Sequence, residues 1–130
     1  MSLKTTIRLS LEWAIRCFTK EHVYNIPVRA LRINEEAIEF AQACLVSREK
    51  MHKLVDAVYN RPKGEVKDEV THLLMTTVVF CAAHGLDPEQ LLEDEVSRVL
   101  SQPPDRWIKR NTEKNILGFG IDPADKRDGI

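Results

Sequence analysis

Apolar residues along this chain recur mostly three and four residues apart, which is the spacing of amphipathic helices. Almost nowhere do apolar and polar residues alternate as they do in a half-buried strand. Ser47 and Asp87 stand where helix N-caps are expected, and a proline follows the second of them. The pattern therefore predicts an all-α, multi-helix bundle, with helices over residues 5–18, 28–46, 48–59, 65–83, 88–100 and 105–114.

The segments between these helices are short, as in a single domain. At 130 residues the chain is long enough for one core but not for two independent cores. We expect one all-α domain over residues 1–117, interrupted by a polar break without helix at residues 19–22. Glycine and proline are frequent after residue 117, so residues 118–130 are predicted to form an extended or loosely ordered tail.

The helix over residues 65–83 is apolar on nearly every side after His72. Such a helix is expected to be central and buried. Its β-branched residues 76–79 also fit a short buried strand, because a short apolar run is common to buried strands and buried helices. Because one small domain cannot easily cover so apolar a helix, we expect a homodimer or a homotetramer.

Composition and charge limit the partners. The formal net charge of -1 offers no basic footprint for nucleic acid. No uncharged apolar run approaches the roughly 18 residues of a membrane span. The three cysteines lack CxxC spacing and a secretory context, so we expect buried, reduced thiols in a cytoplasmic protein; they are Cys17, Cys44 and Cys81.

Three glutamates form an acidic cluster on the helix over residues 28–46. Glu35, Glu36 and Glu39 are three or four residues apart, so their side chains leave the same side of the helix. On a helical wheel this side borders the apolar arc, and carboxylates beside a packing face cost free energy unless a cation compensates them. The same spacing also fits a solvated acidic face. Spacing alone does not decide between a cation-binding cluster and such a face.

A second polar group, Glu69 with His72, opens the apolar helix over residues 65–83. If the two helices pack together, the carboxylates of both can surround a hard divalent cation. Magnesium is usually held by a few carboxylates plus substrate phosphates, which raises phosphate chemistry as a possible function. Alternatively, His72 is a core histidine.

Much of the chain, from about residue 11 to residue 115, resembles the MazG-like all-α nucleoside triphosphate pyrophosphohydrolases. The resemblance is closest to a small phage and proteobacterial branch of that family. It rests on several stretches, which are residues 13–18, 32–40, 42–43, 54–59, 61–65, 69–70 and 82–87. It extends more weakly to Asn111 and Lys114.

The family signature is an EExxE motif on one helix and an ExxD motif on the next long helix. Glu35, Glu36 and Glu39 match the first motif completely. Glu69 matches the first position of the second motif, whereas His72 stands where the family has its aspartate.

The resemblance implies a dimer or tetramer of packed helices. It also implies hydrolysis by attack of water at the α-phosphate of a nucleotide, releasing a monophosphate and pyrophosphate. Glu35 then orients the water or acts as a further metal ligand. The implied metal ligands are Glu36, Glu39, Glu69 and His72, and the implied phosphate-binding residues are Lys109, Arg110, Asn111 and Lys114. Carboxylates suit Mg²⁺, whereas the histidine favours Mn²⁺, so either metal fits this set.

Two other classes of protein fit the same residues. One is a non-catalytic bundle of the same fold that acts by binding. The other is a di-iron carboxylate bundle, because ExxH motifs occur at residues 49–52 and 69–72. A di-iron site also needs one glutamate from each of two further helices, for which Glu35 or Glu39 and Glu12 are available.

Overall fold

The computed structural model describes residues 1–123 of the chain, and every regular element in that part is helical. The all-α prediction is confirmed, and the strand alternative for residues 76–79 is wrong, since they lie inside a helix. Residues 124–130, most of the predicted tail, lie outside the described residues. The elements are α1 Leu3–Phe18, α2 Lys20–Tyr24, α3 Ile26–Ala43, α4 Arg48–Tyr59, α5 Val66–Ala83, α6 Pro88–Leu100, α7 Asp105–Lys114 and a π-helical turn, Asn115–Phe119.

Side-chain caps explain where three of these helices begin. The Ser47 hydroxyl accepts a hydrogen bond from the Lys50 amide at 3.1 Å, and α4 starts at the next residue. The Asp87 carboxylate accepts from two amides of the first turn of α6. Both caps were predicted from sequence and are confirmed. Asn25 caps α3 in the same way, which places the start of this helix two residues before the predicted one.

The polar break predicted at residues 19–22 is in fact mostly helical. Thr19 has a φ of 74°, and its amide donates to the Ile15 carbonyl at 3.0 Å to end α1. Its hydroxyl then accepts from the His22 amide at 3.4 Å and starts the five-residue helix α2. One residue in a left-handed conformation therefore turns the chain without leaving a loop, which polarity alone does not reveal.

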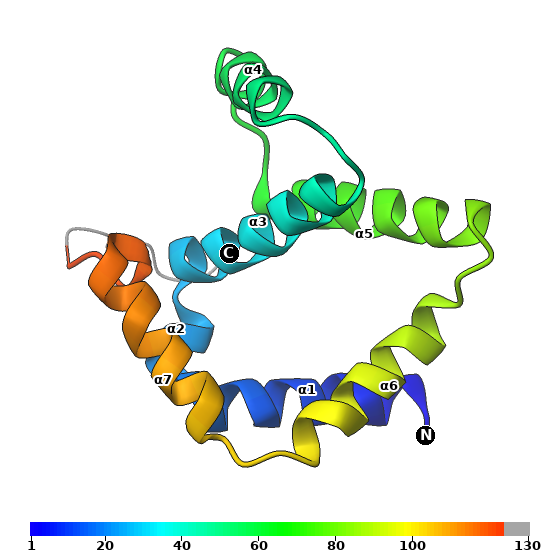
Figure 1. Ribbon diagram of the computed structural model, residues 1–130, viewed down its shortest axis with the longest axis vertical. Coiled ribbons are helices and arrows are strands. Elements are labelled where there is room, and N and C mark those ends of the chain that lie inside the picture. The colour runs from blue at the N-terminus through cyan, green and yellow to red at the C-terminus, as the bar shows by residue number, and fades with distance from the viewer. Residues whose placement is uncertain (124–130) are drawn as a thin grey trace.

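The core lies where α6 and α7 cover α1 (Figure 1). Cys17, Val99 and Trp107 are buried there, one from each helix. Trp13 and Phe18 pack against this cluster, and the rings of Trp13 and Trp107 meet edge to face with centroids 5.3 Å apart. The aromatic side chains thus join α1 to α7.

Helices α4 and α5 lie apart from this core, and α4 projects beyond α3 (Figure 1). Cys81 is the buried residue of α5, and α4 has none. The prediction that the apolar helix α5 is central is therefore wrong for the single chain. The reason is that, within residues 1–123, α5 makes no extensive contact with another helix; its aromatic contact to α3 is between Phe40 and Phe80, with centroids 4.9 Å apart.

All three cysteines are free thiols. Cys17 and Cys81 are buried as predicted, and burial raises the pKa of the Cys17 thiol. Cys44 is exposed, so that part of the prediction is wrong; it is the C-cap of α3, where the chain leaves the helix toward α4.

None of the described helices alone is long and apolar enough to cross a membrane. Helices α5 and α6 taken together have the length and composition of a span, but the chain bends by 103° between them.

Candidate functional site

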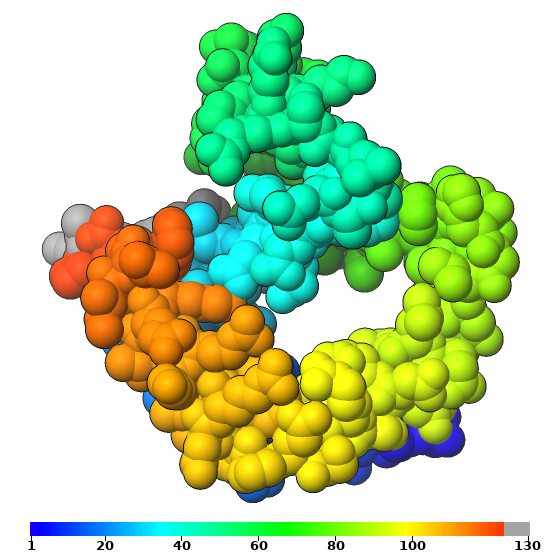
Figure 2. Space-filling view, in the orientation of Figure 1, coloured from blue at the N-terminus to red at the C-terminus, as the bar shows by residue number. Residues whose placement is uncertain are grey.

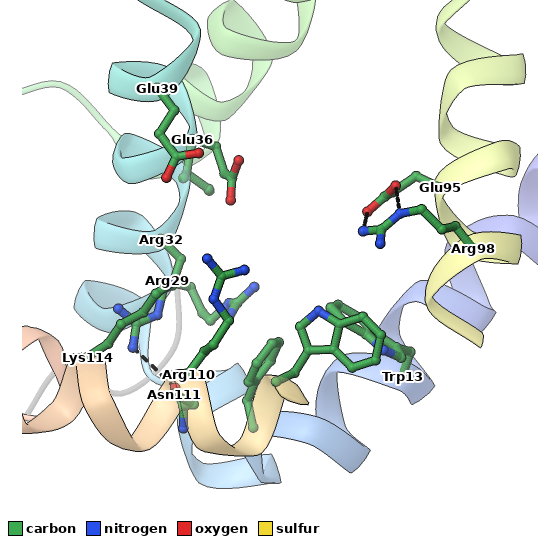
Figure 3. A pocket seen from close by; sticks show the side chains of 13 residues that line it. Trp13, Arg29, Arg32, Glu36, Glu39, Glu95, Arg98, Arg110, Asn111 and Lys114 are labelled. Atoms are coloured by element: carbon green, nitrogen blue, oxygen red, sulfur yellow. Dashed lines mark hydrogen bonds and ion pairs between the residues drawn. The ribbon is translucent and has the colours of Figure 1, made fainter. Parts of the chain in front are cut away.

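One face of α3 carries four charged residues that line the same cavity. Arg29, Arg32, Glu36 and Glu39 are spaced three, four and three residues apart, which places them along one side of the helix. The cavity they line has a volume of about 430 Å³. Two arginines and two carboxylates therefore follow one another along a single wall (Figure 3).

Helix α7 supplies the adjoining wall in the same way. Trp107, Arg110, Asn111 and Lys114 lie on one side of this helix and line the cavity. Trp13 and Phe18 of α1 contribute aromatic rings from the core. The polar groups of α7 thus lie next to the aromatic core.

The lining has an order that Figure 3 makes visible. Glu36 and Glu39 lie at one end, Arg32 and Arg110 lie next to them, and Trp13 lies toward the other end. An elongated ligand in this cavity meets carboxylates first, then guanidinium groups, then an aromatic surface.

Two polar contacts hold α7 against α3, although the residues are far apart in sequence. The Lys114 ammonium forms an ion pair with the Glu35 carboxylate, and both side chains are about seven-tenths buried. The Arg32 guanidinium donates to the amide oxygen of Asn111 at 3.1 Å. Glu35 is therefore neutralised by Lys114 next to the cavity, rather than pointing free into it.

The arginines of this wall are poorly neutralised. Burial lowers the pKa of Arg29, and the neighbouring charge of Arg32 lowers it further. The Arg29 guanidinium lies over the Phe18 ring, 5.6 Å from its centroid. Among residues 1–123, Arg29, Arg32 and Arg110 form no ion pair with a carboxylate. Guanidinium groups without a carboxylate partner are chemically suited to bind an anion.

Glu95 and Arg98 of α6 form the wall across from α3 (Figure 3). Arg98 donates two hydrogen bonds to the Glu95 carboxylate, at 2.8 and 2.6 Å. These bonds lower the pKa of Glu95 and raise that of Arg98. The pair is thus already satisfied, whereas the arginines of α3 and α7 form no ion pair with a carboxylate among the described residues.

The structure brings together only part of the site predicted from sequence. Five of the predicted residues line the cavity, and they are Glu36, Glu39, Arg110, Asn111 and Lys114. Glu35 touches it only through its ion pair with Lys114. Lys109 is exposed on α7 and does not line the cavity.

Glu69 and His72 are not part of this cavity. They lie near the start of α5 and contact each other, with Nδ1 and Oε2 3.5 Å apart, and both side chains are mostly exposed. His72 is therefore not a core histidine of the single chain. No three His, Cys, Asp or Glu residues within the described part of the chain are arranged to hold a metal ion.

The ligands that the di-iron alternative requires are not brought together either, among residues 1–123. Glu49 of α4 is four-fifths exposed and lies 3.3 Å from the ammonium of Lys53. Helix α4 projects away from the cavity, so its ExxH motif joins no other predicted ligand among residues 1–123.

Sequence reasoning missed the arginines of α3 and the residues of α6 that line the cavity. A signal for the arginines was present, because Arg29 and Arg32 continue the face of Glu36 and Glu39 by one turn and more. Nothing in the sequence indicated that α6 stands across from that face, since this depends on how α6 packs on α1.

Comparisons of the chain with protein-family models, with curated proteins and with solved structures gave no match.

Proposed function

We propose that the protein is a metal-dependent nucleotide pyrophosphohydrolase, which cleaves a nucleoside triphosphate or a related nucleotide into a monophosphate and pyrophosphate. The observation that carries the proposal is the order of groups in one cavity of about 430 Å³: carboxylates, then guanidinium groups, then aromatic rings. A nucleotide with a bound cation has the matching order of metal, phosphates and base.

The phosphates are assigned to the arginines. Arg29, Arg32 and Arg110 carry positive charge without a carboxylate partner among the described residues, and a guanidinium can bind a phosphate through two parallel hydrogen bonds. Because Arg29 and Arg32 repel each other in a partly buried wall, an anion between them relieves that repulsion.

The cation is assigned to Glu36 and Glu39. Mg²⁺ is commonly bound by one or two carboxylates together with substrate phosphates, so two carboxylates beside the arginines suit it even without a third protein ligand. When bound, such a metal neutralises phosphate charge and lowers the pKa of a water molecule. Mn²⁺ accepts the same oxygen ligands.

Glu35 is the proposed residue that orients the attacking water. Its carboxylate is now held by Lys114, which itself lines the cavity. When phosphates arrive, the Lys114 ammonium gains a second, more highly charged acceptor, and Glu35 becomes free to accept a hydrogen bond from water. The water oxygen then bonds to the α-phosphorus as its proton passes to the Glu35 carboxylate, the bond from that phosphorus to the bridging oxygen breaks, and pyrophosphate leaves with that oxygen.

The base is assigned to the aromatic end of the cavity. Trp13 is only partly buried, and its indole N–H has no hydrogen-bond partner in the described protein. Stacking of a base on an aromatic side chain contributes about 1–3 kcal/mol and tolerates different bases.

The test is release of pyrophosphate from a panel of ribo- and deoxyribonucleoside triphosphates, with Mg²⁺ and then with Mn²⁺. We expect release from at least one nucleotide and none after chelation of the metal. Nucleotide binding without release from any member of the panel would favour a non-catalytic binding protein. Co-purified iron, with absorbance that appears on oxidation, would favour the di-iron alternative.

Replacing His72 with aspartate is predicted to leave the ratio of Mg²⁺-dependent to Mn²⁺-dependent activity unchanged, because His72 lies outside the cavity that holds Glu36 and Glu39. A carboxylate oxygen suits Mg²⁺ better than an imidazole nitrogen does, so a ratio shifted toward Mg²⁺ would instead place His72 at the metal. The side chain is mostly exposed in the single chain, so the substitution should change the unfolding free energy by no more than about 0.5 kcal/mol. The measurement is the ratio of the two metal-dependent rates in His72→Asp and in the wild type.

The matched control is His52→Asp, in the other ExxH motif, on the projecting helix α4. It should leave the ratio of the two rates unchanged. An unchanged ratio in His72→Asp as well would agree with a metal site built on Glu36 and Glu39 without His72.

A further inference from the structure

The two polar contacts between α3 and α7 differ in their net charge. Lys114 has a carboxylate partner, Glu35, so the two charges of that pair cancel. Arg32 has an amide partner, because its guanidinium donates a hydrogen bond to the side-chain oxygen of Asn111 at 3.1 Å (Figure 3). An amide oxygen carries no formal charge, so this second contact leaves the positive charge of Arg32 without compensation.

The contact between Arg32 and Asn111 belongs to the wall of the cavity. Both residues line it, and both are half-buried. In Figure 2, α7 (orange) lies against α3 (light blue to cyan), beside the hollow that these two helices share with α6 (yellow). Since a guanidinium only donates hydrogen bonds, the oxygen of the Asn111 amide has to face Arg32. The hydrogen bond therefore fixes the direction of the Arg32 guanidinium at the cavity wall.

An aspartate at position 111 would suit a contact whose only task is to hold α7 against α3. Aspartate has nearly the shape of asparagine, and its two oxygens can accept parallel hydrogen bonds from a guanidinium. The same cavity contains such a pair in Glu95 and Arg98. Arg32 instead stays without a counter-charge close to Arg29, whose pKa it lowers. The empty cavity thus carries a repulsion between like charges, which a bound anion relieves.

We propose that Asn111 is a positioning residue of the phosphate site, which orients the Arg32 guanidinium and leaves its charge available to the anion. This role differs from the one that the family resemblance implies, in which Asn111 binds the phosphates itself. It rests on the proposed function, in which the arginines bind the phosphates. The gain in affinity comes from order, because a guanidinium that is already held loses less rotational freedom when the anion binds.

The test is binding of inorganic pyrophosphate to the full chain in metal-free buffer, measured by calorimetry, together with thermal unfolding of the same proteins. Asn111→Asp should weaken binding by roughly 10–100-fold, because the new carboxylate takes the charged hydrogen bonds that Arg32 otherwise gives to the anion. Its melting temperature should be at least that of the wild type, because Arg32 gains an ion pair. A residue with a merely structural role would not lose binding while the fold becomes no less stable.

A double-mutant cycle separates positioning from direct contact with the anion. Asn111→Ala should weaken pyrophosphate binding by about 2–10-fold, the effect of releasing one long side chain that was held in place. In the background of Arg32→Met, which keeps an apolar stem but has no donor, Asn111→Ala should cause no further loss of affinity. A further loss in that background would mean that Asn111 contacts the anion itself, and it would overturn the proposal.

The matched control is Asn34→Asp, which makes the same change of charge on α3. Asn34 is exposed, does not line the cavity and follows Arg32 by two residues, or about 200° around the helix. Its affinity for pyrophosphate should stay within about 2-fold of the wild type, because an exposed charge is screened by solvent.

The outcomes separate this role from the proposed function. Wild-type affinity in folded Asn111→Asp would overturn the role of Asn111, and so would a wild type that does not bind pyrophosphate. If Asn111→Asp does not fold by circular dichroism, Asn111→Ala and the cycle with Arg32→Met decide. Binding in the expected order of variants, without cleavage of any nucleotide, would support this role and contradict the proposed function.

Discussion

Replacing Glu36 with glutamine is expected to reduce metal-dependent pyrophosphate release by about 100-fold or more. Removing even a group that only supports a metal ligand costs about 10–100-fold in metal affinity or activity, and Glu36 is assigned here to the metal itself. Glutamine keeps the size and shape of the side chain but removes its charge and replaces one acceptor oxygen with a donor NH₂ group. The measurement is kcat/KM at saturating Mg²⁺, together with the affinity of the free protein for Mn²⁺.

The fold should tolerate this substitution. Glu36 is exposed on α3 and forms no ion pair among residues 1–123, so the change in unfolding free energy should stay within about 0.5 kcal/mol. The matched control is Glu49→Gln on α4, whose carboxylate is also exposed but lies outside the cavity. Full activity in Glu36→Gln would contradict the assignment. Loss of bound iron in Glu49→Gln would instead support the di-iron alternative.

Local signals in the sequence were sufficient for most of the helices. Ser47 and Asp87 were identified as caps because a hydroxyl or carboxylate before an apolar periodic segment satisfies free amides of the first turn. These interactions join residues two or three apart, so they are present in the sequence itself. The helical turn at α2 escaped notice because it depends on the left-handed conformation of Thr19, a residue type that rarely adopts it.

The candidate site depends on packing over long sequence distances, and its prediction was correspondingly incomplete. Glu35 and Lys114 are 79 residues apart, as are Arg32 and Asn111. The four side chains meet because α1 positions both the start of α3, through α2, and α7. The spacing of residues along one helix does not show which helices pack together. The arginines of α3 and the Glu95–Arg98 pair of α6 could therefore be recognised only in the structure.

The hydrophobicity of α5 indicates that its apolar surface is buried, but it does not show which part of the protein buries it. Sequence alone places such a helix at the centre of its own chain, because a buried environment is the usual reason for apolar residues on every side. In the structure of the single chain the same residues are exposed. Both observations agree if the covering helices belong to a second copy, as the sequence leads us to expect.

Trp107 belongs both to the hydrophobic core and to the lining of the cavity, so its packing affects the stability of the fold and the shape of the site. This residue is 9% exposed, packs with Cys17 and Val99, and also lines the cavity. Trp107→Ala is expected to reduce the free energy of unfolding by about 3–5 kcal/mol, from the lost apolar burial and the remaining void. For a domain of this size that corresponds to a melting temperature lower by about 10–20 °C.

The effect of Trp107→Ala is best measured by thermal unfolding at a fixed protein concentration, because association would otherwise change the apparent stability. Ile116→Ala is the control: this side chain is 81% exposed in the turn after α7 and should alter the melting temperature by no more than a degree or two. Trp107→Phe should lie between the two, since it keeps an aromatic ring against Trp13 with less volume. If Trp107→Ala and Ile116→Ala unfolded at the same temperature, α1, α6 and α7 would not share the core described here.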